Sequence, residues 1–356
     1  MKKFLVIFFA ALALTIARAG QPDGTLDVYW IDSEGGGSTL IVTPNDESVL
    51  IDSGYAGGRD PGRIVAAAKA AGLTKIDFML LTHFHNDHFG GGPEVAEALP
   101  VGAIYERQIP AGDPDGKVQS SFQTQIKPWR EIAAKRMTLS PGVTLPLRAV
   151  AGGPKLELVC LYADQKIIGP TADQMKVKNP LTGTGSPKTF AFSDNDNSAG
   201  FVLTFGGFRF MEGGDVTWNV EEKVVTPYNV AGSIDVYQTN HHGNSDSSNP
   251  ILLKSIAPTV VVMNNGPRKG GQAGAFASLK AAPSVKALYQ VHKSFVAPAE
   301  ANAPEEFIAN LEDLRGAEAA KCPANFIKLS VAPDGKSYTI SIPAKGHSRT
   351  YQTSVK

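Results

Sequence analysis

Apolar runs separated by glycine-rich and polar turns extend along most of the chain. Runs rich in β-branched and aromatic residues, each bounded by turn residues, predict strands at 25–31, 38–43 and 48–52. The nearly continuous apolar run at 75–82 is typical of a strand buried on both faces. Later strands are predicted at 155–162, 233–239, 259–265 and 286–291, and hairpins at 200–215 and 325–342 with turns at Gly206-Gly207 and Asp334-Gly335.

Helix signals alternate with these strands. Asp60 followed by Pro61 predicts the start of a helix that Gly72 ends, and Pro93 predicts the start of another helix at 93–99. Further helices are predicted at 129–137, 251–257 and 304–314. The stretch 168–193 is rich in Gly, Pro, Thr and Lys, which predicts a long loop of the kind that is usually functional or disordered.

The N-terminus has the three-part layout of a secretory signal peptide. Two lysines precede an apolar run from Phe4 to Ile16, and the small-x-small sequence Ala17-Arg18-Ala19 follows. A transmembrane anchor is the alternative, but the run is shorter than the roughly 20 residues that span a bilayer. We therefore predict cleavage of residues 1–19 near Ala19, secretion or a periplasmic location, and no stable membrane anchor.

Charge is balanced overall but unevenly distributed. The chain has 34 basic and 34 acidic residues, so the whole protein has no overall steering field. Between Lys117 and Lys188, eleven basic residues stand against four acidic ones. A solvated surface is the simpler interpretation. The alternative is a basic flap over an anionic substrate, either a small molecule or a nucleic acid. No protein partner can be inferred from the sequence.

The chain contains two cysteines, Cys160 and Cys322. In an exported protein they could form one disulfide. Cys160 lies in the apolar run LELVCLY, which is equally typical of a buried free thiol. Neither cysteine has Cys-x-x-Cys spacing, so the sequence assigns neither to a metal.

The stretch LTHFHNDHFGG at 81–91 concentrates candidate metal ligands at the end of the buried strand at 75–82. On extended backbone His83 and His85 face the same way, and Asp87 and His88 follow beyond the bend. Imidazole and carboxylate groups are the ligands that zinc prefers beside thiolate. Six residues could therefore supply two ligands to each of two metal ions.

Two further histidines and two carboxylates also lie at strand ends. His241 and His242 follow the strand at 233–239, so five of the seven histidines follow two predicted strands. Asp215 ends a strand-like run, and a carboxylate there could bridge two cations. Asp52 also ends a strand, and we interpret it as a carboxylate that orients a ligand histidine.

These motifs together resemble those of the metallo-β-lactamase superfamily. The resemblance consists of T-H-x-H-x-D-H followed by G-G, an upstream I-D-S-G, a later G-G-D and then H-H-G. The stretches DVYWIDSEGGGSTLIV, NDNSAGFVLTFGGFRFMEGGD and HHGNSDSS are similar to the extracellular domain of bacterial DNA-uptake (competence) channel proteins. The likeness covers about residues 25–295.

The resemblance implies an α/β fold, a four-layer αββα sandwich with two metals bound at one edge between its sheets. We expect the domain to span 20–345, with an insertion or flap at 105–193 and a C-terminal extension at 296–345. Carried over by position, the expected metal ligands are His83, His85, Asp87, His88, Asp215 and His242. In the family the ligand directly precedes glycine, which favours His242 and leaves its neighbour His241 as the alternative.

The chain departs from the family in two places. Many members have another histidine ligand between the first cluster and the bridging aspartate, and this chain has none between His88 and His241. Asn197 or water could complete the first site, and an oxygen-richer site would suit manganese or iron alongside zinc. The branch also typically shows a Gly-Gln-Gly-Asp turn where this chain reads EGGG.

The expected reaction is hydrolysis by a metal-bound hydroxide, with two zinc ions as the most favoured cofactor. Asp87 would ligate and orient the water, and His292 would bind substrate or protonate a leaving group. The basic segment and the resemblance favour a phosphodiester substrate, as in a nuclease. A β-lactam, lactone or thioester hydrolase is the runner-up, since fold does not determine substrate. A non-catalytic secreted binding module is the third alternative.

Overall fold

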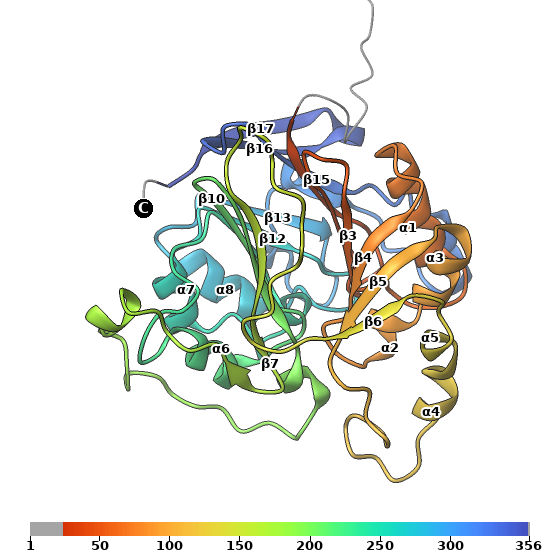
Figure 1. Cartoon of the computed structure of the whole chain (residues 1–356), viewed down its shortest axis with the longest axis horizontal. Coiled ribbons are helices and arrows are strands. Elements are labelled where there is room, and N and C mark those ends of the chain that lie inside the picture. The colour runs from red at the N-terminus through yellow and green to blue at the C-terminus, as the bar shows by residue number, and fades with distance from the viewer. Residues whose placement is uncertain (1–23, 355–356) are drawn as a thin grey trace, which may run out of the picture.

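The computed structural model describes residues 24–354 (Figure 1). The predicted signal peptide, residues 1–19, lies outside the described residues. Within 24–354, every helix is too short or too polar to cross a membrane.

One sheet has nine strands. Its order is β17 (His347–Gln352), β16 (Ser337–Ile342), β15 (Ile327–Val331), β1 (Leu26–Trp30), β2 (Thr39–Val42), β3 (Ser48–Ile51), β4 (Ile76–Leu80), β5 (Val101–Glu106) and β6 (Lys135–Thr138). The strands from β3 to β6 run parallel, with Leu50 of β3 opposite Met79 of β4, and the remaining pairs are antiparallel. Parallel pairing places the carboxyl ends of β3 and β4 at one edge of this sheet.

The other sheet has eight strands. Its order is β14 (Ile308–Asn310), β13 (Ala287–His292), β12 (Val260–Met263), β11 (Val236–Gln238), β10 (Phe208–Glu212), β9 (Gly200–Phe205), β7 (Leu156–Ala163) and β8 (Lys166–Ile167). The strands from β10 to β14 run parallel, so the loops that follow β10, β11 and β12 leave from the same edge.

The two sheets pack face to face, and helices cover their outer faces (Figure 1). Alternation along β1 divides its side chains, because Val28 and Trp30 join the core between the sheets while Tyr29 joins the core under the helices. The helices over the first sheet are α1 (Arg59–Ala70), α3 (Gly92–Ala98), α4 (Phe122–Gln125) and α5 (Lys127–Arg130). Those over the second are α6 (Trp218–Val225), α7 (Pro250–Ile256) and α8 (Ala273–Ala281). This arrangement confirms the predicted αββα sandwich.

Short helical segments complete the chain. They are α2 (Asn86–Phe89), η1 (Gln174–Lys176), η2 (Asp194–Asn197), η3 (Asn240–Gly243), η4 (Ala299–Ala301), η5 (Glu305–Phe307), η6 (Gly316–Lys321) and η7 (Pro343–Lys345). The predicted long loop at 168–193 contains only η1. The segment expected as an insertion supplies β6, β7 and β8, and the expected C-terminal extension supplies β14, β15 and β16.

Two predicted helices were wrong. In the stretch 129–137 the helix ends at Arg130 and the chain forms β6, where Lys135 lies opposite Ala103 of β5. In the stretch 304–314 a single 3-10 turn gives way to β14, where Ile308 lies opposite Gln290 of β13. In both places an open sheet edge supplies hydrogen bonds that local propensity does not anticipate.

The N-terminus of α1 also differs from the prediction. The helix begins at Arg59 after Gly58, whose φ of 81° lies in the left-handed region, so Asp60 is inside the first turn and is not the cap. The Asp60 carboxylate instead accepts a hydrogen bond from the Tyr55 amide at 2.8 Å. This bond holds the 52–58 loop against the start of the helix.

Candidate metal centre

The predicted histidine cluster lies at the carboxyl end of β4, where the chain turns into α2. His83 and His85 come from the extended part, and the His83 Nε2 lies 3.0 Å from the His85 Nδ1. Asp87 and His88 come from α2 and are buried. One pair of side chains therefore comes from extended backbone and the other from a helix. Both pairs point toward the same region, as the sequence predicts.

Asp215 is the residue on which the histidines converge. Its carboxylate oxygens lie 3.2 Å from the His88 Nε2 and 3.2 Å from the His242 Nε2. The preceding residue, Gly214, has a φ of +57°, and a Cβ there would come within 2.7 Å of the Thr82 Cβ. Glycine at 214 therefore lets the loop after β10 approach the end of β4 closely.

Four residues form what we call the central group. Each offers one ligand atom, and these atoms all lie within 4.8 Å of one another; the members are Asp87, His88, Asp215 and His242. Among the described residues, the buried His88 Nε2 and both ring nitrogens of His242 have no hydrogen-bond partner. Close nitrogen and oxygen atoms without hydrogen-bond geometry fit a set of metal ligands, because unpaired buried polar atoms are otherwise costly.

His241 and His83 also face the Asp215 carboxylate. The His241 Nε2 is 3.8 Å and the His83 Nε2 is 3.9 Å from the Asp215 Oδ2. The His241 Nδ1 lies 2.8 Å from Asp246, which holds the ring so that the Nε2 faces Asp215. The sequence favoured His242 and left His241 as an alternative, whereas the structure brings both side chains to the same carboxylate.

Both histidines of this pair have unusual backbone conformations. The φ angles of His241 and His242 are 48° and 53°, in the left-handed region that residues other than glycine rarely adopt. Two consecutive residues in this region aim adjacent side chains at different oxygens of Asp215. Backbone strain of this kind is concentrated at functional sites.

Two further carboxylates, Asp52 and Asp115, each contact one ring nitrogen of a histidine and so orient its ring. The Asp52 Oδ2 lies 2.6 Å from the His88 Nδ1, and the Asp115 Oδ1 lies 2.9 Å from the His85 Nε2. Asp52 thus lies where a carboxylate that orients a ligand histidine is expected. Sequence analysis missed Asp115, which follows β5 in an irregular loop and has no motif around it.

The surroundings of the histidines shift their pKa values in different directions. Burial and the neighbouring His88 lower the pKa of His83 well below its ordinary value, so His83 offers a lone pair at neutral pH. Burial would also lower the pKa of His88, but Asp215 and Asp52 outweigh it and raise that pKa well above the ordinary value. Burial opposes ionisation of Asp215, yet the surrounding histidines hold its pKa well below the usual range. The carboxylates around His88 therefore favour positive charge at this position.

Lys269 is a second residue that sequence analysis missed. Its Nζ contacts the Asp87 Oδ2 and lies 3.2 Å from the Tyr55 hydroxyl. Lys269 comes from the glycine-rich loop after β12, and the available signal was its place at the carboxyl end of a parallel strand. The structure thus adds a cation directly beside a candidate metal ligand.

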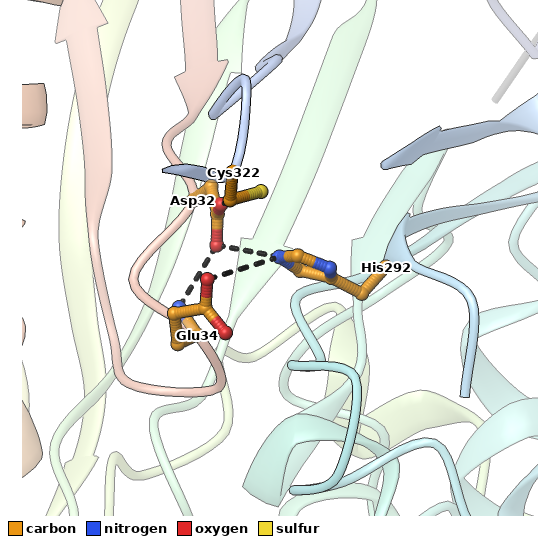
Figure 2. A group of neighbouring side chains, drawn as sticks. All are labelled: Asp32, Glu34, His292 and Cys322. Atoms are coloured by element: carbon orange, nitrogen blue, oxygen red, sulfur yellow. Dashed lines mark hydrogen bonds and ion pairs between the residues drawn. The ribbon is translucent and has the colours of Figure 1, made fainter. Parts of the chain in front are cut away.

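Two predicted residues are not brought to Asp215. The Asn197 amide donates to Asp194 at 3.0 Å and accepts from Gln165 at 3.2 Å, and Asn195 is the amide beside His241. His292 lies in a separate group, which we call the outer cluster: Asp32, Glu34, His292 and Cys322 (Figure 2). The proposed roles of Asn197 and His292 at the centre are therefore unsupported by their contacts.

The two cysteines are both free and buried. Cys160 lies in the core between the sheets, and Cys322 lies in the outer cluster. The disulfide alternative is therefore wrong for this structure, and Cys322 has metal-ligating neighbours that its sequence spacing did not reveal.

Comparisons with known proteins agree with the motifs. Residues 32–155 match the model of the metallo-beta-lactamase superfamily. The chain is 26% identical over 245 residues to Competence protein ComA of Neisseria gonorrhoeae, which is 69% of this chain and 28% of that protein. It is 33% identical over 166 residues to a UPF0173 metal-dependent hydrolase of Cupriavidus necator, which is 46% of this chain and 48% of that protein. The resemblance seen in the sequence is confirmed.

The matched part spans less than half of either curated relative. A solved structure of Igni18, a metallo hydrolase from the archaeon Ignicoccus hospitalis, is 14% identical, with a TM-score of 0.41, over 74% of this chain and 94% of that one.

Proposed function

We propose that this protein is an exported metal-dependent hydrolase that cleaves phosphodiesters. The observation that carries the proposal is the convergence of ligand atoms from the ends of three strands on Asp215, with the Lys269 ammonium group beside them. The names of its relatives support hydrolysis, and the signal-peptide pattern at residues 1–19 supports export.

The residues around Asp215 fit two divalent ions. His83, His85 and His241 would hold one ion, Asp87, His88 and His242 would hold the other, and Asp215 would bridge them. This assignment replaces the family's missing histidine with His241, so neither Asn197 nor an oxygen-rich site is required. Ligands that are histidine nitrogens and carboxylate oxygens favour zinc, with manganese or iron as alternatives. When bound, such ions supply Lewis acidity and lower the pKa of water.

The chain's own groups account for binding and orientation. Asp87 accepts hydrogen bonds at the edge of the centre and would orient the attacking water. The Lys269 ammonium group lies beside Asp87, where it would neutralise a phosphoryl oxygen. Burial would lower the pKa of Lys269, but Asp87 and Asp215 outweigh it and raise that pKa above its ordinary value, so the ammonium group stays charged over the working range.

The proposal is tested by metal analysis of the purified protein, paired with hydrolysis of bis-p-nitrophenyl phosphate before and after chelation. We expect metal at the centre and turnover that chelation removes and added zinc or manganese restores. Turnover that survives complete removal of metal would contradict the proposal. Protein that takes up no metal would contradict it as well.

Lys269→Met tests the substrate class. We expect kcat/KM for the phosphate diester to fall about 100-fold, because one lost electrostatic contact typically has this effect. The metal content should stay unchanged. Arg268→Met is the matched control, since the neighbouring Arg268 pairs with Asp313 at the surface and should leave turnover intact. Equal activity of the two variants would remove Lys269 from substrate binding.

A second candidate function is hydrolysis of a lactone, thioester or β-lactam. The observation that favours it is a set of exposed apolar side chains, Val118, Phe190 and Phe192, which are 101%, 38% and 59% exposed. They lie within three residues of Asp115 or Ser193, and Asp115 contacts both Ser193 and His85. If the protein hydrolyses nitrocefin or a simple lactone and does not hydrolyse the phosphate diester, this second function is the correct one.

A further inference from the structure

The outer cluster brings together side chains from three distant parts of the chain. Asp32 and Glu34 lie in the loop after β1, His292 is the last residue of β13, and Cys322 follows η6. One candidate ligand atom from each lies within 4.8 Å of all the others. Figure 2 shows the Asp32 carboxylate, the Glu34 carboxylate and one ring nitrogen of His292 pointing toward one another, with the Cys322 side chain beside Asp32.

The contacts within the cluster are short and mostly buried. The His292 Nε2 lies 2.8 Å from the Asp32 Oδ1 and 4.0 Å from the Glu34 Oε1. The Cys322 Sγ lies 3.5 Å from the Asp32 Oδ2. Asp32 and His292 are 0% and 1% exposed. A nitrogen, a sulfur and two carboxylate oxygens thus meet in a region from which water is largely excluded.

We propose that the outer cluster binds one zinc ion, at a site separate from the centre around Asp215. Structural zinc sites are closed and tetrahedral, with four protein ligands drawn from cysteine, histidine and carboxylates. The outer cluster offers four ligands of these types. A thiolate and an imidazole select zinc over magnesium or calcium, which prefer oxygen ligands alone.

Charge balance supports a divalent ion. Arg63 donates to the Asp32 Oδ2 at 2.9 Å and lies 3.5 Å from the Glu34 Oε1, so one cation already faces the two carboxylates. With Cys322 as a thiolate the cluster carries three negative charges, which Arg63 and a divalent ion together neutralise. Among the described residues, Arg63 is the one lysine or arginine that forms ion pairs with the buried Asp32 and the partly buried Glu34, and two adjacent carboxylates in such surroundings favour a further positive charge.

The thiol of Cys322 donates only a weak hydrogen bond, to the Asp32 Oδ2 at 3.5 Å. Zinc binding deprotonates a coordinating thiol and converts this neutral group into a strong ligand. The proton goes to solvent, and no oxidation or reduction is involved.

A zinc ion here would fix the loop that touches the centre. Further along the same loop, the Gly37 amide donates to the Asp87 carbonyl oxygen at 3.0 Å. A Cβ at Gly37 would lie 2.6 Å from the His88 Nδ1, so glycine is needed for this close packing. The zinc ion would therefore join the loop of the first sheet to β13 of the second and hold the glycines against the motif after β4.

Cobalt substitution tests the proposal on the full-length protein under reducing conditions. Co²⁺ bound by a thiolate gives a near-ultraviolet charge-transfer band that nitrogen and oxygen ligands do not give. We expect this band in the wild-type protein and its loss on addition of Zn²⁺. Cys322→Ser should abolish the band, and Cys160→Ser is the matched control that should retain it, because Cys160 is also buried but lies in the apolar core.

The outcomes separate this site from the centre. A protein that binds Co²⁺ without a thiolate band would overturn the proposal, as would a band that persists in Cys322→Ser. If Cys322→Ser does not fold, X-ray absorption at the zinc edge of the wild-type protein decides instead. A sulfur neighbour at about 2.3 Å supports the outer site, and its absence in zinc-loaded protein contradicts it. Neither measurement depends on hydrolytic activity.

Discussion

The central group and the outer cluster contain similar residues, but the side-chain atoms that lack hydrogen-bond partners differ between them. In the central group, ring nitrogens of His88 and His242 are buried without a hydrogen-bond partner. In the outer cluster, the Asp32 carboxylate accepts bonds from Arg63, from the Glu34 amide and from the His292 Nε2, and the buried ring nitrogen without a partner is the other one, the His292 Nδ1. Open donor sets at strand ends suit exchange of water and substrate, whereas a closed four-ligand set suits a structural ion.

The difference extends to the nearest cations. Lys269 approaches the central group from a loop on the second sheet, and its ammonium group carries three donors on a flexible stem. Arg63 approaches the outer cluster from α1, and its planar guanidinium is better suited to a fixed ion pair. If both groups hold metal as proposed, residue types alone would not separate the catalytic site from the structural one.

The largest expected effect comes from Asp215→Asn. Loss of the carboxylate that would bridge the two proposed ions should lower kcat/KM for the phosphate diester at least about 10³-fold, roughly 4 kcal/mol of transition-state stabilisation. Metal analysis should show loss of the central ions and retention of one zinc ion in the outer cluster. Loss of all metal in this variant would mean that the two groups are not independent. Asp173→Asn, at an exposed position, is the control.

Glu212 offers a pH test of how buried carboxylates are stabilised. Burial would raise the pKa of Asp32, but His292 and Arg63 outweigh it and lower that pKa. Among the described residues, no lysine, arginine or histidine forms an ion pair with Glu212, and burial and the charge of Asp52 raise its pKa to about 8. Native Glu212 therefore holds a proton that the unfolded chain releases near pH 4.5.

The stability from this proton is fully present below pH 4.5 and is lost as the pH rises through about 8. For metal-free protein, we expect the free energy of unfolding to fall by about 2–4 kcal/mol more in the wild type than in Glu212→Gln between those limits. Urea titrations at a series of pH values measure this difference. Parallel curves for the two proteins would show that Glu212 is ionised in the native state.

The smallest expected effect comes from Asp52→Asn. The asparagine can keep the contact to His88 but not the negative charge, so we expect metal affinity at the centre to fall about 10–100-fold. Competition with a chelator of known affinity measures this change. Zinc in the outer cluster should be retained, and a parallel loss from both sites would indicate general unfolding.

Most strands and the ligand motif were predictable because they are encoded locally. The hydrophobic runs at 25–31, 38–43 and 75–82 gave strands within a residue or two of their observed ends. The helices predicted at 129–137 and 304–314 failed, since pairing with β5 and β13 overrode local propensity. Short apolar segments near a sheet edge do not carry enough sequence signal to reveal such pairing.

The candidate metal ligands at the ends of β4, β10 and β11 could be read from the amino-acid sequence alone, because each motif is continuous and follows a recognisable apolar strand. Only the tertiary structure decided that His241 and His242 both face Asp215, and that Lys269 contacts Asp87. It also decided that Cys322 reaches Asp32 across 290 residues of sequence. Such contacts depend on sheet order, register and loop path, and these are fixed by packing across the whole fold rather than by local pattern.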